Sequence, residues 1–115
     1  MSPINEDNLG RRRFLLHRDK AVEHALERVR HAGKSEWELF SAEERATLKS
    51  GLAEIWINTT HERWHQYCFS TLTRKDILEL VALCRDIKVH HRLTDETFRS
   101  SEAILLHCSH NNHPR

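Results

Sequence analysis

The stretch from His61 to His65 has residue types at a spacing that could carry out metal-dependent hydrolysis, because it reads His-Glu-Arg-Trp-His. On a helix, two histidines four positions apart lie on one face and can bind the same zinc ion, and the glutamate after the first can act as general base. Catalytic zinc also takes a third protein ligand and keeps one position open for water. This segment therefore raises the hypothesis of a zinc-dependent hydrolase with Glu62 as its base.

The third ligand of such a hydrolase has to come from elsewhere, and the candidates are Asp86, His90 and His91. Two features weaken the hypothesis: Arg63 places a positive charge inside the motif, and no strand is predicted that could border a substrate cleft. Ten of the 115 residues are histidines, so a chance match to a short histidine motif is easy. The sequence therefore favours a protein that is not an enzyme, and no catalytic residue is assigned.

A structural zinc site is the second interpretation of the same segment. His61, His65 and Cys68 are four and seven positions apart, so one helical face would carry all three. Cys84 or a residue of the turn at 90–91 could complete a tetrahedral set. The simplest interpretation has no cofactor, with the two histidines at the edge of the helix and the cysteines packed as small hydrophobic residues. Zinc is therefore kept as an alternative.

Composition and charge limit the class of protein. The 115 residues suit one domain, and only three Gly and two Pro favour helices with short connections. Lys and Arg total 18 against 17 Asp and Glu, which is not the profile of a dedicated nucleic-acid binder. The ten histidines are expected to raise the net charge steeply on mild acidification.

The cysteines and the hydropathy of the chain bear on its location. Cys68, Cys84 and Cys108 are widely spaced and form no CxxC pair, so no disulfide framework is expected and a reducing cytoplasm is the simplest location. The polar start of the chain does not resemble a signal peptide. No run of about eighteen apolar residues occurs, so no membrane span is expected.

The periodicity in the N-terminal half predicts helices. Leu15, Val22 and Val29 recur every seven positions and predict a first helix with one apolar stripe. A short helical turn is then expected to carry Trp37 and Phe40 into the core.

Capping signals predict the helices that follow. Ser41 and Glu44 have the spacing of a capping box at the start of the second main helix, which is expected to break near Asn58 and to restart as a segment that reaches 68. Thr73 and Thr94 are placed to cap the last two helices. The fold class is therefore all-α: a single small domain of four to five helices, as a bundle with a C-terminal αα-hairpin. Its expected bounds are a flexible lead over 1–10, the helical domain over 11–106 and a histidine-rich flexible tail over 107–115.

Residues 76–106, DILELVALCRDIKVHHRLTDETFRSSEAILL, resemble the short C-terminal helical hairpin called SHOCT. The matching features are a leucine-rich helix, the segment LTDETF from Leu93 to Phe98 and the paired leucines Leu105 and Leu106. The chain departs from the family at the turn, where a histidine pair stands in place of the usual glycine. The resemblance implies an oligomerising or protein-binding hairpin and supplies no catalytic residue.

Two further groups of side chains lie on the first helix. His17, His24 and His31 form a column that faces largely outward; successive members are about 10 Å apart along the axis, too far to share one metal ion. The column is interpreted as a solvated face, with a pH-sensitive contact surface as the alternative. The second group consists of candidates for phosphate contacts: Arg11, Arg12, Arg13 and Arg18.

The function expected from the sequence is that of a small protein-binding regulator, inhibitor or adaptor, acting through helical faces on another protein or on a second copy of itself. Compact helical proteins of this kind are often carried by phages and plasmids, and such an origin is a further expectation. A zinc protein using the His61–His65 motif and a nucleic-acid-binding regulator using the arginines are the alternatives. The candidate interface residues are Leu15, Val22, Val29, Trp37, Trp56 and Trp64.

Overall fold

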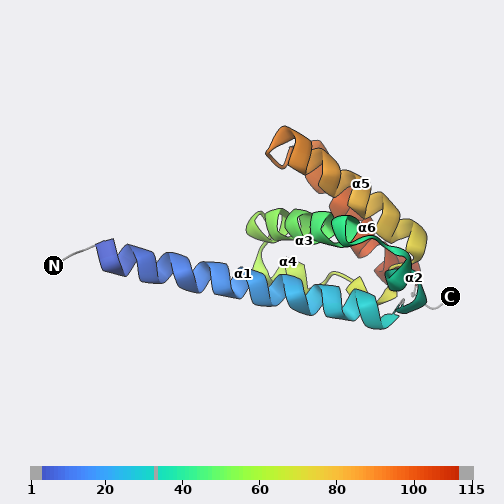
Figure 1. Cartoon of the computed structure of the whole chain (residues 1–115), viewed down its shortest axis with the longest axis horizontal. Helices are drawn as coiled ribbons and strands as arrows, with labels where there is room; N and C mark the ends of the chain where they lie inside the picture. The colour runs from blue at the N-terminus through green and yellow to red at the C-terminus, as the bar shows by residue number, and fades with distance from the viewer. Residues whose placement is uncertain (1–3, 33, 112–115) are drawn as a thin grey trace.

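The chain folds as an all-α domain, which confirms the predicted fold class. The computed structural model describes residues 4–32 and 34–111. Within these ranges the helices are α1 (Ile4–Ala32), α2 (Lys34–Leu39), α3 (Ala42–Ile57), α4 (His61–His65), α5 (Arg74–His90) and α6 (Asp95–Asn111), with a 3₁₀ turn, η1, at Phe69–Thr71 (Figure 1). None of the helices in these ranges combines the length and the hydropathy that a membrane span requires.

Helix α1 is longer than predicted, and its N-terminal half projects from the rest of the molecule (Figure 1). Residues 4–10, expected to be a flexible lead, are helical. Helix α6 likewise continues to Asn111, five residues into the segment expected to be a tail. The last residues of that tail, 112–115, lie outside the described ranges.

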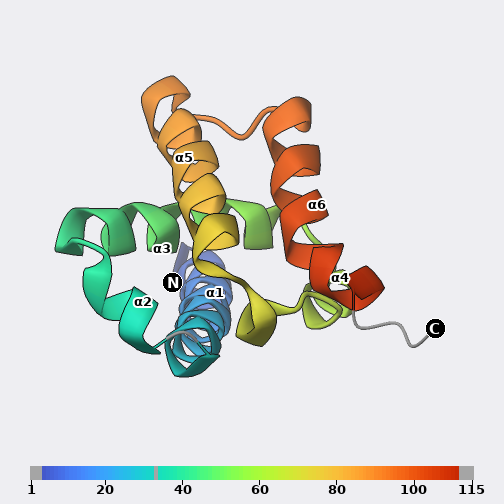
Figure 2. The same cartoon turned by 90° about the vertical axis from the view of Figure 1, so that its right-hand side faces the viewer.

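Helices α3 and α5 cross closely in the centre of the domain, and α1 packs across α3 and η1. Helices α5 and α6 stand side by side as the predicted hairpin, with α1 seen end-on below them (Figure 2). Five side chains at the centre have at most 1% exposure: Leu48, Leu52, Ile55, Leu80 and Leu105. The same hydrophobic core includes Val22, Ala25 and Val29 of α1 and Trp64 of α4.

Local capping determines where most helices begin, as predicted. Ser41 and Glu44 form a complete capping box at α3, and Thr73 does the same for α5 with Asp76. At α6, the Thr94 hydroxyl accepts a hydrogen bond from the Thr97 N–H at 3.1 Å. These caps satisfy N–H groups that have no partner inside the helix.

Helices α3 and α5 both end at polar residues, where glycine or proline is more usual. Asn58 ends α3 where the break was predicted, and Thr60 caps α4 through the Arg63 N–H. His91 ends α5 in the left-handed conformation, with φ of 56°. That conformation is the one glycine usually supplies at a helix end, and here a histidine adopts it.

Candidate functional site

Helix α4 presents the two histidines of the motif on one face, as predicted. Its five residues run from His61 to His65, and the two imidazole rings have centroids 4.3 Å apart. Both histidines are exposed. Trp64, which lies between them, is only 7% exposed and packs into the core.

The predicted helical position of Cys68 is wrong. Helix α4 ends at His65, and the chain then turns through Gln66 into η1. The Cys68 N–H donates to the Leu105 carbonyl at 2.9 Å instead of to a carbonyl one turn earlier. The argument that placed Cys68 on the face of His61 therefore fails. In the parts of the chain that the structure describes, no three His, Cys, Asp or Glu side chains gather closely enough to hold a metal ion.

The other proposed ligands lie away from the histidine pair. Cys84 is 1% exposed against α3, and burial raises the pKa of its thiol to about 12, so it stays protonated and packs as a small hydrophobic residue. His91 lines a separate hollow between α3 and α5, and the hairpin turn that carries it lies at the end of α5 away from α4 (Figure 2). Asp86 and His90 are exposed on α5.

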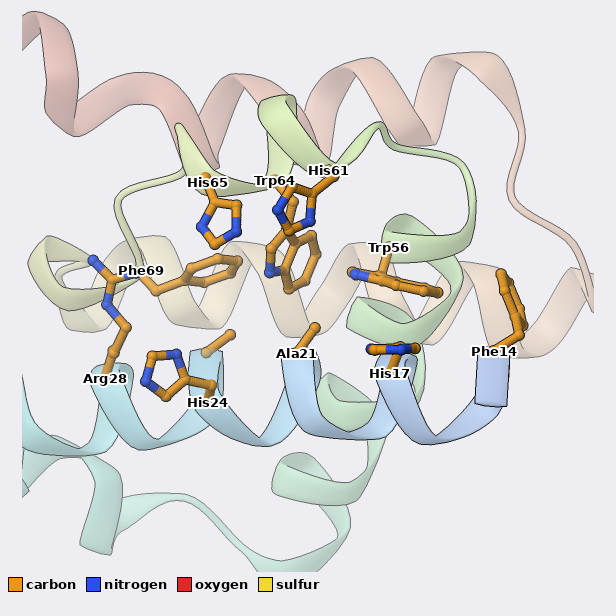
Figure 3. A pocket seen from close by; sticks show the side chains of 11 residues that line it. Phe14, His17, Ala21, His24, Arg28, Trp56, His61, Trp64, His65 and Phe69 are labelled. Atoms are coloured by element: carbon orange, nitrogen blue, oxygen red, sulfur yellow. The ribbon is translucent and has the colours of Figure 1, made fainter. Parts of the chain in front are cut away.

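A groove of about 450 Å³ between α1 and α4 is the candidate functional site (Figure 3). It follows α1 from Phe14 to Arg28 and lies beneath α4; we call it the α1–α4 groove. His17 and His24 of α1 line it together with the two α4 histidines, and Figure 3 shows His24 and His65 directed toward the same space from opposite sides. His17 and His24 are exposed, as predicted, but the surface they share with α4 was not expected from the sequence.

Aromatic side chains make up much of the wall of the α1–α4 groove. Trp64 and Phe69 pack with centroids 5.0 Å apart at its base. At one end, Phe14 of α1 contacts Trp56 of α3 at 5.2 Å between centroids, and Phe14 remains 45% exposed. The α1 residue facing this wall between the two histidines is Ala21, whose small side chain leaves the space open. The groove therefore offers apolar ring surface that solvent can reach.

The opposite end of the groove is cationic. Arg28 is half-buried there, and no carboxylate in the described ranges forms an ion pair with it. Of the described side chains that line the groove, none is a carboxylate. An aromatic wall beside an unpaired cation suits a ligand that is apolar over part of its length and carries negative charge.

A polar clamp holds α4 against α6 and so positions one side of the groove. Arg63 donates to both carboxylate oxygens of Glu102, at 2.9 and 3.2 Å, and the Tyr67 hydroxyl donates to the same carboxylate at 2.8 Å. Thr59 lies 3.2 Å from that hydroxyl. Arg63, which is foreign to the zinc motif, thus has a structural partner 39 residues away.

The clamp predicts a pH-dependent contribution to stability. The hydrogen bond from Arg63 holds the pKa of Glu102 below its ordinary value of 4.5, so its contribution is complete above that value and is lost as pH falls through the lowered pKa. We expect Glu102→Gln to cost about 1 kcal/mol near neutral pH, because the amide keeps an acceptor oxygen but loses the charge that strengthens the hydrogen bonds from Arg63 and Tyr67. In urea unfolding, the difference in stability between the two proteins should narrow as pH falls below the ordinary pKa of 4.5 and through the lowered one; a difference that is constant with pH would contradict the role of the carboxylate.

The remaining candidate residues divide between core and surface. Val22, Val29 and Trp64 are at most 7% exposed, so they are core residues and not available to a partner in this fold, which corrects their placement as interface candidates. Leu15 is half-buried, and so is Trp37, whose ring lies under the Arg45 guanidinium at 5.4 Å.

The arginine cluster of α1 is partly neutralised. Arg11, Arg12 and Arg13 are exposed on the projecting part of the helix. Arg18 is half-buried and pairs with Asp19 at 3.1 Å. Three of the four arginines proposed to contact phosphate are therefore adjacent and exposed to solvent.

Comparison with family models, with curated proteins and with solved structures found no match for this chain. What the α1–α4 groove binds must therefore be argued from its own residues.

Proposed function

We propose that this chain is a small protein-binding module, a regulator, inhibitor or adaptor, that engages a partner through the α1–α4 groove without catalysis. The observation that carries the proposal is the groove itself, an open space of about 450 Å³ with aromatic rings on its wall. Grooves between helices that combine apolar rings with a few polar groups are common protein-recognition surfaces.

The exposed aromatic end of the groove supports a protein as the partner. Phe14 is 45% exposed and rests on the half-buried Trp56. Aromatic side chains, Trp and Tyr above all, are enriched at the energetic centres of protein interfaces. Trp56 is thus the interface candidate from the sequence that best fits this role. The cysteine content agrees with a reducing cytoplasm as the place of action.

The resemblance of residues 76–106 to the SHOCT hairpin agrees with the same function, because that family implies oligomerisation or protein binding. A second copy of the chain is accordingly one form that the partner can take.

Zinc binding is the second candidate function, favoured by the His61–His65 ring pair with centroids 4.3 Å apart. Its test is elemental analysis of untagged protein, purified without metal-affinity resin or chelator, with His65→Ala for comparison. If wild type holds one zinc ion per chain and the variant holds none, zinc binding would replace protein binding as the proposed function. If the zinc-loaded protein also catalyses a hydrolysis that requires Glu62, the chain would be an enzyme.

The direct test of the protein-binding proposal is affinity capture from the source cells after nuclease treatment. Wild-type protein is compared with Phe14→Glu in the groove and with Val89→Glu, a matched control on α5 where the side chain is 69% exposed. We expect a stoichiometric protein partner that wild type and the Val89 variant retain and the Phe14 variant loses. The His61→Ala, Glu62→Ala and His65→Ala proteins should keep some affinity for it.

Two results would count against the proposal. A partner that all three proteins bind equally would place the interface outside the groove. Capture that depends on nucleic acid and is lost on changing Arg11, Arg12 and Arg13 to Gln, with a steep dependence on salt, would favour the nucleic-acid alternative.

A further inference from the structure

The charge of the α1–α4 groove has one sign among the described residues. Arg28 and four histidines line it, while the carboxylates on the same stretch of α1 are engaged by cations outside the lining. These pairs are Asp19 with Arg18, Glu23 with Lys49, and Glu27 with Arg30. These three carboxylates thus have cation partners of their own, Glu62 of α4 is not among the lining residues, and Arg28 is left for a ligand.

The length of the groove favours a chain segment over a compact ligand. Its lining extends along α1 from Phe14 to Arg28, fourteen positions, which is about 21 Å at the rise of an α-helix. An extended peptide covers that distance with about six or seven residues. The aromatic end at Phe14 and the cationic end at Arg28 are therefore far enough apart to contact different side chains of one segment.

The width of the groove depends on small side chains of α1. Ala21 and Ala25 lie one turn apart and face Trp64 and Phe69 across the space. Ala25 is 2% exposed and belongs to the core, whereas Ala21 is half-buried and borders the opening. A ring at position 21 would occupy the place that we assign to the anchor of the ligand.

We infer that the occupant of the groove is an acidic peptide segment of a partner protein. An aromatic or branched aliphatic side chain of that segment packs against the accessible rings of Phe14 and Trp56 beside Ala21, and its carboxylates face Arg28 and the histidines. This inference rests on the proposed protein-binding function and adds the chemistry of the partner. Complementary charge also steers the segment toward the groove, so binding weakens with salt.

The experiment is selection of a displayed library of random twelve-residue peptides on the full chain, followed by affinity measurement of the selected peptides. Four proteins are compared: wild type, Arg28→Glu, Ala21→Phe, and Arg99→Glu as a control on the exposed surface of α6. Circular dichroism and unfolding curves establish that each variant is folded before binding is measured.

We expect the selected peptides to be enriched in Asp and Glu around one aromatic or branched aliphatic residue. Arg28→Glu and Ala21→Phe should each lower their affinity by about tenfold or more, and Arg99→Glu should leave it within about twofold. The Arg28 variant should in turn select peptides enriched in Lys and Arg.

Other outcomes separate the inference from the function on which it rests. The selected peptides could lose affinity for Ala21→Phe, show no enrichment in Asp and Glu, and bind Arg28→Glu as tightly as wild type. That result would overturn the inference of an acidic partner but would still support the groove as a protein-binding site. Failure to select any peptide sensitive to Ala21→Phe would count against both. A dimeric mass in analytical ultracentrifugation that Ala21→Phe converts to a monomer would make a second copy the occupant and overturn the inference.

Discussion

Gly51→Ala is expected to lower the free energy of unfolding by about 3 kcal/mol, at the upper end of the usual cost of overpacking a core. A Cβ atom at position 51 would lie 2.0 Å from the Sγ and 2.4 Å from the Cβ of Cys84, and 3.1 Å from its Cα. The last contact is with backbone, so a rotamer change of Cys84 cannot relieve it. Helices α3 and α5 would have to separate, and the core between them would lose contacts.

Gly10→Ala is the matched control for this prediction. It replaces a helical glycine that has nothing within 4 Å of the added Cβ, so it should stabilise the protein slightly, by up to about 1 kcal/mol. Urea unfolding measures both changes. Cys84→Gly should recover part of the loss in the Gly51→Ala background, because it removes the two closest atoms. If Gly51→Ala were as harmless as Gly10→Ala, the close crossing of α3 and α5 would be incorrect.

Trp64→Ala is expected to destabilise the protein by about 3–5 kcal/mol, the usual cost of deleting a buried aromatic side chain. The indole is 7% exposed and packs against Phe69 and Tyr67, with ring centroids 5.0 and 5.7 Å away. It also forms part of the wall of the α1–α4 groove. Its loss should therefore loosen α4 and remove groove binding together with stability.

Two further variants test whether the loss of stability in Trp64→Ala comes from the buried position of this ring or would follow the loss of any tryptophan. Trp64→Phe keeps a ring in the same space and should retain more than half of the lost stability. Trp37→Ala removes a half-buried indole at the edge of the core and should cost less than Trp64→Ala. Thermal and urea unfolding measure all three variants. Equal losses for Trp64→Ala and Trp37→Ala would contradict the central position of Trp64.

Local structure was predictable where its causes lie within a few residues of one another. The capping boxes at Ser41 and Thr73 and the cap at Thr94 are where their spacing predicts, because a side chain and an N–H three residues apart determine each. The same locality explains the shared face of His61 and His65 on α4. The function expected from these patterns, protein binding with zinc as the alternative, stays a prediction.

The end of α4 was not predictable in this way. Spacing alone extends the helix to Cys68, but the Cys68 N–H bonds to Leu105 on α6. Arg63 likewise departs from the zinc motif because it pairs with Glu102 of α6. Both partners are more than thirty residues away in the chain, where no local pattern indicates them.

An all-α chain, most of the helix starts and the residues able to carry charge or aromatic surface could be predicted from the order of the amino acids. The packing of the helices was needed to show that His17 and His24 of α1 line the same groove as His61 and His65 of α4, with Arg28 at its end. The same packing buries Val22, Val29 and Trp64 in the core and leaves Phe14 exposed. The physical reason is that helix formation depends mainly on residues that are near one another along the chain. A groove forms only when the helices pack and bury some of their faces while leaving others exposed.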